Sequence, residues 1–496
     1  MIQHCPVLIV LLPLTAALLC LLFSKLNKNL GSWLVIGSIA GSLACSLQVL
    51  HQTLTSGEAI HYWMGNWAPP LGIEFVIDPL SAVMAVLITF ISLMVALYSK
   101  PFMRNEDWLH IGGYYTLYGL LTLGLCGMVI TGDVFNLYVY LEVMSLSGYG
   151  LIAMGGRKSM LAAFRYMLIG TIGASLYLLA VAYLYAMTGT LNMADLGARI
   201  MPYLSSPPFA LAVACLFIGF GIKMALFPLH GWQPDAYNFA HPGSAAFIAG
   251  VMSKVPAYAI IRFFFYIFGV NNPIIGTALT VLGILGIGGV LIGSVMALAQ
   301  YDFRRMLAYS SVAQIGYIAI GLAIGNMYGF IGAVLHIINH AFMKSALFLV
   351  IGGIQYRFGE INLYRLGGLN KKMTLSTITV TLAALSMVGI PPTAGFFSKW
   401  YLMLGAYQGG QYFYIVVLVI SSLLNAIYFF RILEQMFVQH EASLTEINRH
   451  EGKLGLPPEM AIPIFCAGIG ILVLGFYSVD IVNDILKSGL PEVFLR

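Results

Sequence analysis

Residues 331–355 read IGAVLHIINHAFMKSALFLVIGGIQ, a largely apolar run that carries His336, His340 and Lys344. A helix of about 20 apolar residues crosses a hydrocarbon core about 30 Å thick, so this run is long enough to span a membrane. Its three titratable residues follow one another at intervals of four and therefore lie on one face of the expected helix. The run predicts a transmembrane helix that carries a polar line.

The composition of the whole chain also indicates a membrane protein. Hydrophobic residues make up 60% of the 496 residues and charged residues only 9%, whereas soluble domains are about 25% charged. The net charge of +5 is therefore taken to reflect the membrane topology of the chain and not a nucleic-acid-binding surface. The first apolar run has no preceding basic region or small-residue cleavage site, which predicts a retained span. The six cysteines lie without ligand spacing, so we expect neither a metal site nor a disulfide framework.

Apolar runs recur from end to end and predict an all-α polytopic membrane protein with about 14 transmembrane helices, some of them broken. The expected spans are 5–24, 31–51, 76–99, 112–131, 135–154, 163–187, 207–238, 244–267, 274–299, 306–324, 327–355, 374–407, 412–435 and 460–482. The longest polar stretch, at about 436–458, is predicted to be a loop.

The basic residues give an orientation. Sixteen of them flank odd-numbered connections, and only Arg199 lies in an even-numbered one. The sixteen are Lys25, Lys28, Lys100, Arg104, Arg157, Lys158, Arg165, Arg304, Arg305, Arg357, Arg365, Lys371, Lys372, Arg431, Arg449 and Lys453. By the positive-inside rule, the odd connections face the cytoplasm and both termini face outward. We expect a multi-pass protein of a bacterial or archaeal cell membrane.

Several titratable residues lie inside the expected spans, where a charge at the bilayer centre costs about 2.5–3.5 kcal/mol even on the lenient insertion scale. They are Glu142, Lys223, Lys254, Arg262, His336, His340, Lys344 and Lys399. Such residues usually face the protein interior and mark ion pathways. For Glu142 the alternative is a structural ion pair, and for the two histidines it is core packing. Arg262, nearer a helix end, is expected to snorkel or to pair structurally.

Prolines interrupt the helices near three of these lysines. The neighbours are Pro228 and Pro234 for Lys223, Pro256 for Lys254, and Pro391 and Pro392 for Lys399. Broken helices at membrane depth are tolerated where they line a cavity or binding site. A desolvated lysine can exchange a proton near neutral pH, as histidine can, whereas arginine cannot. Because no carboxylate or cysteine accompanies His336 and His340 on their helix, we favour a proton relay over a metal site.

Two stretches of the sequence resemble each other and predict an internal repeat. Asp133 opens a span that continues to the motif at 147–150, SGYG, and Asp302 opens a span that continues to 315–318, IGYI. Two spans after each comes a proline-broken helix with a lysine, Lys223 in the first case and Lys399 in the second. The offset of five spans is odd, so the two units would cross the membrane in opposite directions, as in transporters with inverted repeats.

With these motifs the chain resembles the antiporter-like family shared by Mrp-type multisubunit cation/proton antiporters, respiratory complex I and membrane-bound hydrogenases. The resemblance covers nearly the whole chain. It rests on GDVFNLYVYLEVM at 132–144, KMALFPLHGWQPDAY at 223–237, SKVPAYAIIRF at 253–263, LHIINHAFMKSALF at 335–348 and GIPPTAGFFSKW at 389–400. Within the family the chain looks most like the D-type subunit of Mrp antiporters, in its length and in having Lys399.

The resemblance implies four parts: helices 1–3 in residues 1–111, a five-helix unit in 112–268, an inverted five-helix unit in 269–437, and a loop with helix 14 in 438–496. It also implies site roles. Glu142 and Lys223 would form the pair of the first unit, Lys254 the connection, His336 and His340 the central relay, and Lys399 the terminal site. We call these six the relay residues.

The function implied is a proton-translocating subunit of a sodium/proton antiporter, with other subunits, protons and sodium as partners. The alternative is a proton-pumping subunit of an NADH:quinone oxidoreductase or membrane-bound hydrogenase. Because no flavin, nicotinamide, quinone or iron–sulfur motif occurs in the sequence, we expect no cofactor and no redox catalysis by this chain itself. A third class is a self-sufficient permease for a small solute. The sequence argues against it, because it has a series of buried lysines but no obvious selective pocket.

Overall fold

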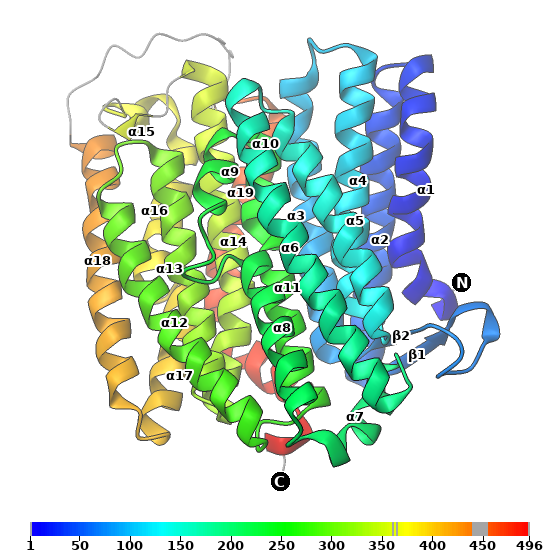
Figure 1. Cartoon of the computed structure of the whole chain (residues 1–496). Helices are drawn as coiled ribbons and strands as arrows, with labels where there is room; N and C mark the ends of the chain where they lie inside the picture. Colours follow the sequence, from blue (N-terminus) through cyan, green and yellow to red (C-terminus); the bar gives the residue numbers. More distant parts are fainter. Residues whose placement is uncertain (1, 360–361, 364–365, 439–454, 495–496) are drawn as a thin grey trace.

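The structure is a computed structural model that describes residues 2–359, 362–363, 366–438 and 455–494. Within these residues it is a bundle of long helices with one small hairpin (Figure 1). The predicted loop at 436–458 lies largely outside the described residues, as do Arg365, Arg449 and Lys453.

The long helices follow the apolar runs of the sequence. They are α1 (Cys5–Leu26), α2 (Leu30–Ser56), α3 (Pro79–Met103), α4 (Trp108–Ile130), α5 (Val134–Ala153), α6 (Arg157–Thr188), α8 (Pro207–Met224), α12 (Pro273–Leu298), α13 (Phe303–Ala323), α14 (Met327–Phe358), α18 (Tyr412–Phe437) and α19 (Pro458–Phe476). Shorter helices are α7 (Met193–Arg199), α9 (Gln233–Phe239), α10 (Pro242–Phe247), α11 (Lys254–Ile261), α15 (Leu369–Lys372), α16 (Thr374–Val388), α17 (Ala394–Gln408) and α20 (Ser478–Asp480).

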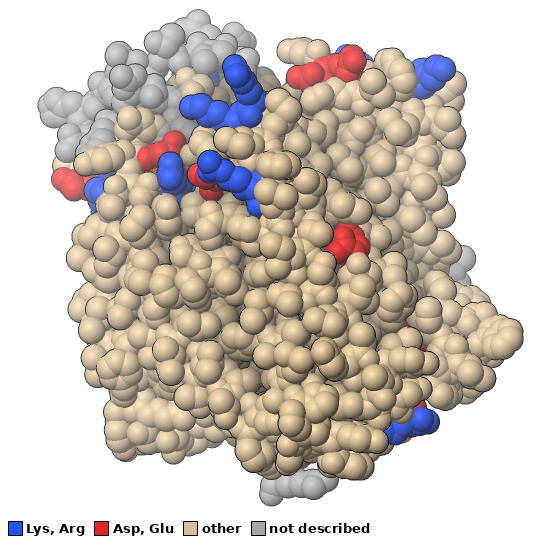
Figure 2. Space-filling view, in the orientation of Figure 1, with Lys and Arg blue, Asp and Glu red and all other residues tan. Residues whose placement is uncertain are grey.

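The predicted all-α polytopic membrane fold is confirmed. In the described part of the chain, 12 helices are long and apolar enough to cross a membrane, counting 242–267 as one continuous helix. The two remaining predicted spans are occupied by α5 and by the pair α16 and α17. Both termini lie at one end of the bundle (Figure 1), and charged side chains gather mainly towards the opposite end, leaving most of the visible face uncharged (Figure 2).

Two of the predicted breaks are real interruptions. The seventh span is divided into α8 and α9, and the twelfth into α16 and α17. The eighth span stays continuous from Pro242 to Ile267, but it contains wide π-helical turns at Ile248–Met252 and Arg262–Ile267. Every residue of the apolar stretch of this span is buried, as are nearly all in α14, so these two elements form the centre of the bundle.

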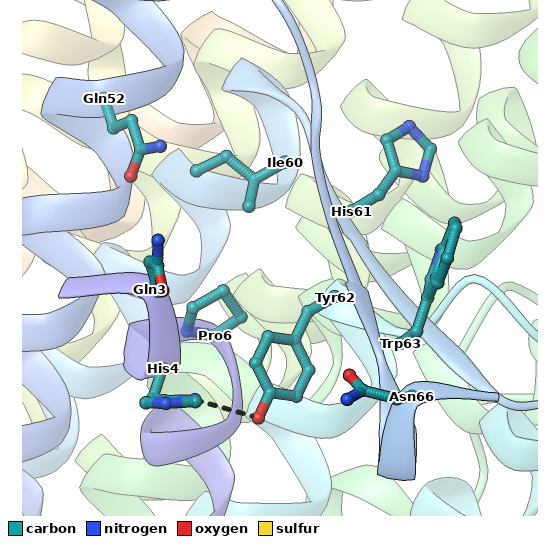
Figure 3. Close-up of a pocket in the computed structure, with 9 residues that line it drawn as sticks. All are labelled: Gln3, His4, Pro6, Gln52, Ile60, His61, Tyr62, Trp63 and Asn66. Atoms are coloured by element: carbon teal, nitrogen blue, oxygen red, sulfur yellow. Dashed lines mark hydrogen bonds between the residues drawn. The ribbon is translucent and has the colours of Figure 1, made fainter. Parts of the chain in front are cut away.

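A short antiparallel hairpin was not predicted. Its strands are β1 (Ile60–Trp63) and β2 (Glu74–Ile77), with Ile60 opposite Ile77 and Trp63 opposite Glu74. It lies beside the start of α1, where His4 Nδ1 and the Tyr62 hydroxyl are hydrogen-bonded at 3.1 Å and both line a pocket of about 490 Å³ (Figure 3). The hairpin also anchors the bundle, because the buried Glu74 carboxylate accepts a hydrogen bond of 2.6 Å from the Asn192 amide before α7.

The two stretches that resemble each other in sequence have equivalent local structure. The Asp133 carboxylate caps α5 and the Asp302 carboxylate caps α13, each by accepting a hydrogen bond from the backbone N–H three residues later. In addition, each aspartate forms an isolated β-bridge with an asparagine that follows the next helix, Asn192 after α6 and Asn362 after α14. The same arrangement of a capping aspartate, two helices and a bridging asparagine therefore occurs twice.

Glycines allow a close approach of α12 and α13. A Cβ at Gly316 would lie 2.6 Å from the Gly286 carbonyl oxygen and 2.8 Å from the Val290 nitrogen. Backbone atoms cannot move aside as a flexible side chain can, so a larger residue must push the helices apart. This is how two apolar helices can pack tightly without a polar contact between them.

We expect Gly316→Val to destabilise the purified protein, because overpacking a close contact costs about 1–3 kcal/mol. Gly276→Val, at a position of α12 where a Cβ meets no atom within 4 Å, is the matched control. Thermal unfolding in detergent should show a lower Tm for the first variant only. Equal Tm values for both variants would contradict the close packing of α12 on α13.

Candidate functional site

Lys223 lies at the last turn of α8, where the helix is interrupted. Ala225 follows with φ 61°, in the left-handed region, and ends the helix. The Trp232 indole then donates to the carbonyl of Ile222 at 2.9 Å, so a carbonyl freed by the break has a partner. The Lys223 ammonium is buried and donates to two hydroxyls of α5, Ser145 at 2.6 Å and Tyr149 at 3.1 Å. The break thus fixes a lysine among neutral acceptors.

The expected ion pair of Glu142 with Lys223 is not formed in this structure. Glu142 precedes Ser145 by three residues and Tyr149 by seven, which places all three on one face of α5. Lys223 contacts the later part of that face, so its donors are satisfied by hydroxyls instead of the carboxylate. Glu142 itself is only half-buried, although it still interacts electrostatically with Lys223.

Lys254 begins α11 directly after the first π-helical turn. It is fully buried, and its ammonium donates to the carbonyl of Ala249 within that turn. The adjacent Ser253 hydroxyl lies 3.5 Å from the Tyr237 hydroxyl, which in turn accepts a hydrogen bond of 2.9 Å from the Gln233 amide. Wide turns leave carbonyls without regular helical partners, and here the lysine occupies one of them.

The two histidines of α14 lie with their rings stacked 5.9 Å apart. His336 is hydrogen-bonded on both nitrogens, through Nδ1 to the Ser398 hydroxyl at 3.0 Å and through Nε2 to the Gln314 side-chain oxygen at 2.9 Å. His340 is fully buried, and neither of its ring nitrogens has a hydrogen-bond partner in the described part of the chain. Lys254, Lys344 and His336 all interact electrostatically with His340.

Lys399 lies in α17, just after the second break. Its ammonium donates to the carbonyls of Met387 at 2.8 Å and Val388 at 2.9 Å, the last two residues of α16, and to the Ser422 hydroxyl at 3.1 Å. The end of a helix carries partial negative charge and unpaired carbonyls. The broken helix therefore provides the acceptors that make a buried lysine tolerable here.

A tyrosine accompanies each of the two lysines at a break. The Lys223 ammonium lies 5.6 Å from the ring centre of Tyr149, and the Lys399 ammonium lies 4.9 Å from that of Tyr317. These tyrosines occupy the same place in the two motifs that resemble each other. The lysines differ in that Lys223 precedes its break and Lys399 follows its own.

Some candidates were not included among the relay residues, although Lys344 was noted among the titratable residues inside spans. Lys344 is fully buried and donates to the carbonyl of Leu307 at 2.7 Å and to the Ser310 hydroxyl at 2.5 Å. It continues the face of His336 and His340, and this spacing could have included it. Ser398 and Gln314 carry no comparable signal, because single polar residues within apolar spans are common.

Arg262 was expected either to snorkel or to pair structurally, and the structure shows a structural ion pair. Its guanidinium lies 2.5 Å from the Asp78 carboxylate at the start of α3 and stacks near the rings of Tyr258 and Tyr266. Both charged side chains are largely buried, with 14% and 18% exposed. The pair fastens the eighth span to the third.

A polytopic helical membrane protein with broken helices and a buried line of lysines and histidines defines the antiporter-like class. The family model described as NADH:quinone oxidoreductase/Mrp antiporter, TM matches residues 131–425, more than half of the chain. A second, described as NADH-Ubiquinone oxidoreductase (complex I), chain 5 N-terminus, matches residues 63–110. The chain therefore belongs to the NADH:quinone oxidoreductase/Mrp antiporter family, and the resemblance inferred from its motifs is confirmed.

Individual relatives come from both branches of the family. The chain is 45% identical over 99% of its length, and 99% of the relative's, to NADH-quinone oxidoreductase subunit N of Desulforudis audaxviator. It is 31% identical over 98% of its length, and 97% of the relative's, to the D-type subunit of the Na(+)/H(+) antiporter of Alkalihalophilus pseudofirmus. A chain of the archaeal membrane-bound sulfane sulfur reductase superposes with a TM-score of 0.90 at 28% identity, over 99% of this chain and 98% of that one.

A buried charge that is held in an ion pair should contribute more to stability than a charge that is not, and Arg262 and Glu142 allow this comparison. Arg262→Met should lower the stability of the protein, because it leaves the largely buried Asp78 carboxylate without an opposite charge, and breaking a buried ion pair typically costs about 3–5 kcal/mol. Glu142→Gln is the comparison: it should leave the Tm nearly unchanged, since Glu142 makes no ion pair within 4.0 Å of a described basic group. Thermal unfolding in detergent measures both. A larger loss for Glu142→Gln than for Arg262→Met would reverse the two assignments.

Proposed function

We propose that this chain is a proton-translocating subunit of a multisubunit sodium/proton antiporter of the Mrp type. The observation that carries the proposal is the line of buried lysines and histidines held by neutral acceptors. None of Lys223, Lys254, Lys344 and Lys399 has a carboxylate within 4.0 Å among the described residues. An ammonium that is not fixed in an ion pair can give up its proton and leave a neutral amine, which suits a relay.

The second half of the relay consists of polar side chains with gaps between them. The rings of His340 and His336 stack 5.9 Å apart with no hydrogen bond between them, so a proton needs a carrier to pass from one ring to the other. His336 is hydrogen-bonded to the Ser398 hydroxyl; Lys399 is the next residue in the chain, and its ammonium donates to Met387, Val388 and Ser422. The Gln314 amide can either accept from His336 or, if turned over, donate to it, so it can serve both protonation states. The Ser398 hydroxyl has the same freedom. We infer that protons move between the histidines and Lys399 through these side chains.

Internal water would complete the line where side chains do not touch. Buried polar atoms without a protein partner in the described residues include both ring nitrogens of His340, the Asn339 and Gln233 amide oxygens and the Tyr166 hydroxyl. Buried polar groups of this kind are commonly bonded to ordered water. They lie along the path from Lys223 towards Lys399, where a relay needs a proton carrier.

Glu142 is proposed to be the input to the relay. A half-buried carboxylate on a membrane span is costly against lipid, so its exposed part is best covered by another subunit with a complementary group. A change in the charge near Glu142 would alter the electrostatic field at Lys223 and hence its affinity for a proton. The family relatives that are named as subunits of larger assemblies support this arrangement.

A second candidate function is proton pumping within a respiratory redox complex, with the chemistry in other subunits. The observation in its favour is the 45% identity to an NADH-quinone oxidoreductase subunit N, against 31% to a D-type antiporter subunit. The relay would be the same in both cases and only the driving reaction would differ. Neighbouring genes for small antiporter subunits would support the antiporter, whereas genes for cluster-binding subunits would support the redox complex.

We also propose the four-part division at residues 1–111, 112–268, 269–437 and 438–496. The matching aspartate caps, asparagine bridges and lysine–tyrosine contacts of the two five-helix units support it. The proposed location is a bacterial or archaeal cell membrane, with both termini outside.

The relay proposal predicts the effect of removing its terminal lysine. Lys399→Met should abolish proton flux through the assembled complex while leaving assembly intact, because a thioether cannot carry a proton. Lys487→Met, at an exposed lysine near the C-terminus, should retain normal flux. Flux is measured by a pH-sensitive dye in vesicles, with assembly followed on native gels. Normal flux through an assembled Lys399→Met complex would make Lys399 structural.

The proposed orientation is tested by accessibility of introduced cysteines in a background without the six native ones. Ser488→Cys, exposed near the C-terminus, should react with an impermeant maleimide added to intact cells. Lys28→Cys, in the α1–α2 connection, is the matched position at the other end and should react only after permeabilisation. The opposite pattern would place the termini in the cytoplasm.

A further inference from the structure

A pocket of about 430 Å³ lies outside the relay, at the end of the bundle opposite the termini. It is enclosed by the connection between α1 and α2, the end of α3, the first turns of α4 and the start of α19. Figure 1 shows α1 and α2 at the edge of the bundle, so this pocket borders the surface that faces lipid. The residues that argue for a ligand are Lys28, Lys100, Arg104, Trp33 and Glu459.

The charges around this pocket do not balance. Glu459 is the one carboxylate among the lining residues, and it pairs with Arg104 at 3.1 Å. Lys28 donates to the backbone carbonyl of Arg104 at 3.0 Å, and the Lys100 ammonium lies 3.4 Å from the centre of the Trp33 ring. Neither lysine therefore has a carboxylate partner within 4.0 Å among the described residues. Two cations remain for an anionic ligand.

The nearby acids in the connection from α3 to α4 do not change this balance at the pocket. Glu106 and Asp107 do not line it. The Asp107 carboxylate instead caps α4, accepting a hydrogen bond of 2.8 Å from the His110 backbone N–H. The pocket is also reached by the first turn of α2, a helix of 27 residues whose N-cap, Asn29, makes no capping side-chain bond. The partial positive charge of that helix end adds to the two lysines.

Apolar surface continues from the pocket along the membrane spans. Trp33 is 51% exposed, and the neighbouring Leu26 and Leu30 are 79% and 44% exposed. One turn beyond Trp33, a Cβ at Gly37 would meet no atom within 4 Å, so the surface of α2 is open there. A ligand with both an anionic head and long apolar chains fits this combination better than a free anion does.

We propose that this pocket binds the headgroup of an anionic phospholipid, with its phosphate beside Lys28 and Lys100 and its acyl chains along α1 and α2. The proposed topology puts the pocket in the cytoplasmic leaflet, where anionic lipids attract basic residues and where basic pockets between spans bind such headgroups. The aromatic ring of Trp33 lies where tryptophans commonly mark the interface. This lipid would hold the α1–α2 pair against α3 and α19.

The test is lipid-dependent thermal stabilisation of the purified, delipidated protein. Phosphatidylglycerol should raise the Tm of the wild type and phosphatidylcholine should not. The variant Lys28→Ser/Lys100→Gln should bind phosphatidylglycerol at least about tenfold more weakly, since each basic residue near the surface contributes severalfold to affinity. Lys25→Ser/Lys487→Gln removes the same charge at exposed positions that do not line the pocket, and it should behave as the wild type.

Three results would overturn the proposal. Equal binding of phosphatidylglycerol by the two double variants would show that the pocket is not its site. Equal stabilisation by phosphatidylcholine would remove the role of the anionic head. Full stabilisation by inorganic phosphate at the same concentration would assign the pocket to a free anion. Native mass spectrometry of the protein in mild detergent provides an independent measurement. The wild type and the Lys25→Ser/Lys487→Gln control should retain an anionic lipid, and the Lys28→Ser/Lys100→Gln variant should lose it.

Discussion

A charge buried in a membrane is costly, and this cost accounts for how the interior lysines of this protein are held. Each lysine in the interior must find acceptors, and the carbonyls of a regular helix are largely used by its own N–H groups. Two of the lysines find acceptors where a helix is interrupted or widened. Lys399 takes the carbonyls at the end of α16, and Lys254 takes one in a π-helical turn. Lys223 and Lys344 use side-chain hydroxyls instead, and Lys344 also takes the Leu307 carbonyl of the unbroken α13.

The nature of these acceptors decides what the lysines can do. Carboxylate partners would hold the ammonium groups in their charged form, as Asp78 holds Arg262. Hydroxyls and carbonyls compensate a charge without fixing it, so the same site can hold an ammonium or a neutral amine. The single carboxylate of the relay, Glu142, stays half-exposed and out of contact with Lys223. It can act on the lysine through the electrostatic field while remaining open to another subunit.

The internal repeat gives this arrangement twice, with one difference. Each unit contains an aspartate cap, after its first helix, that is tied to an asparagine two helices later, and each places a tyrosine beside the lysine of its broken helix. In the first unit the lysine ends the helix before the break, and its acceptors are the hydroxyls of α5. In the second it follows the break and takes the freed carbonyls. The histidines of α14 lie in the second unit, so the proposed relay would differ between the two similar halves.

The class of this protein could be predicted from its amino-acid sequence, because the hydropathy of each segment depends on that segment alone. The length of each apolar run fixed the spans, and prolines at 228, 391 and 392 marked the two breaks. The cost of burial singled out eight titratable residues inside spans, and the family resemblance selected the six relay residues among them. Motifs such as SKVPAYAIIRF were specific enough to indicate the family.

Which side chains contact one another could be seen only in the packed helices. Glu142 and Lys223 both lay in apolar spans, yet the rotation of α5 relative to α8 brought Ser145 and Tyr149 to the lysine and left the carboxylate aside. Neither the β-hairpin that buries Glu74 nor the partners of His336 had a periodic signal in the sequence. In the sequence, Lys28 and Lys100 served only to predict the orientation of the spans. The packing of α1 to α4 brings them together at one pocket. Contacts between spans depend on helix rotation and depth, which hydropathy does not encode.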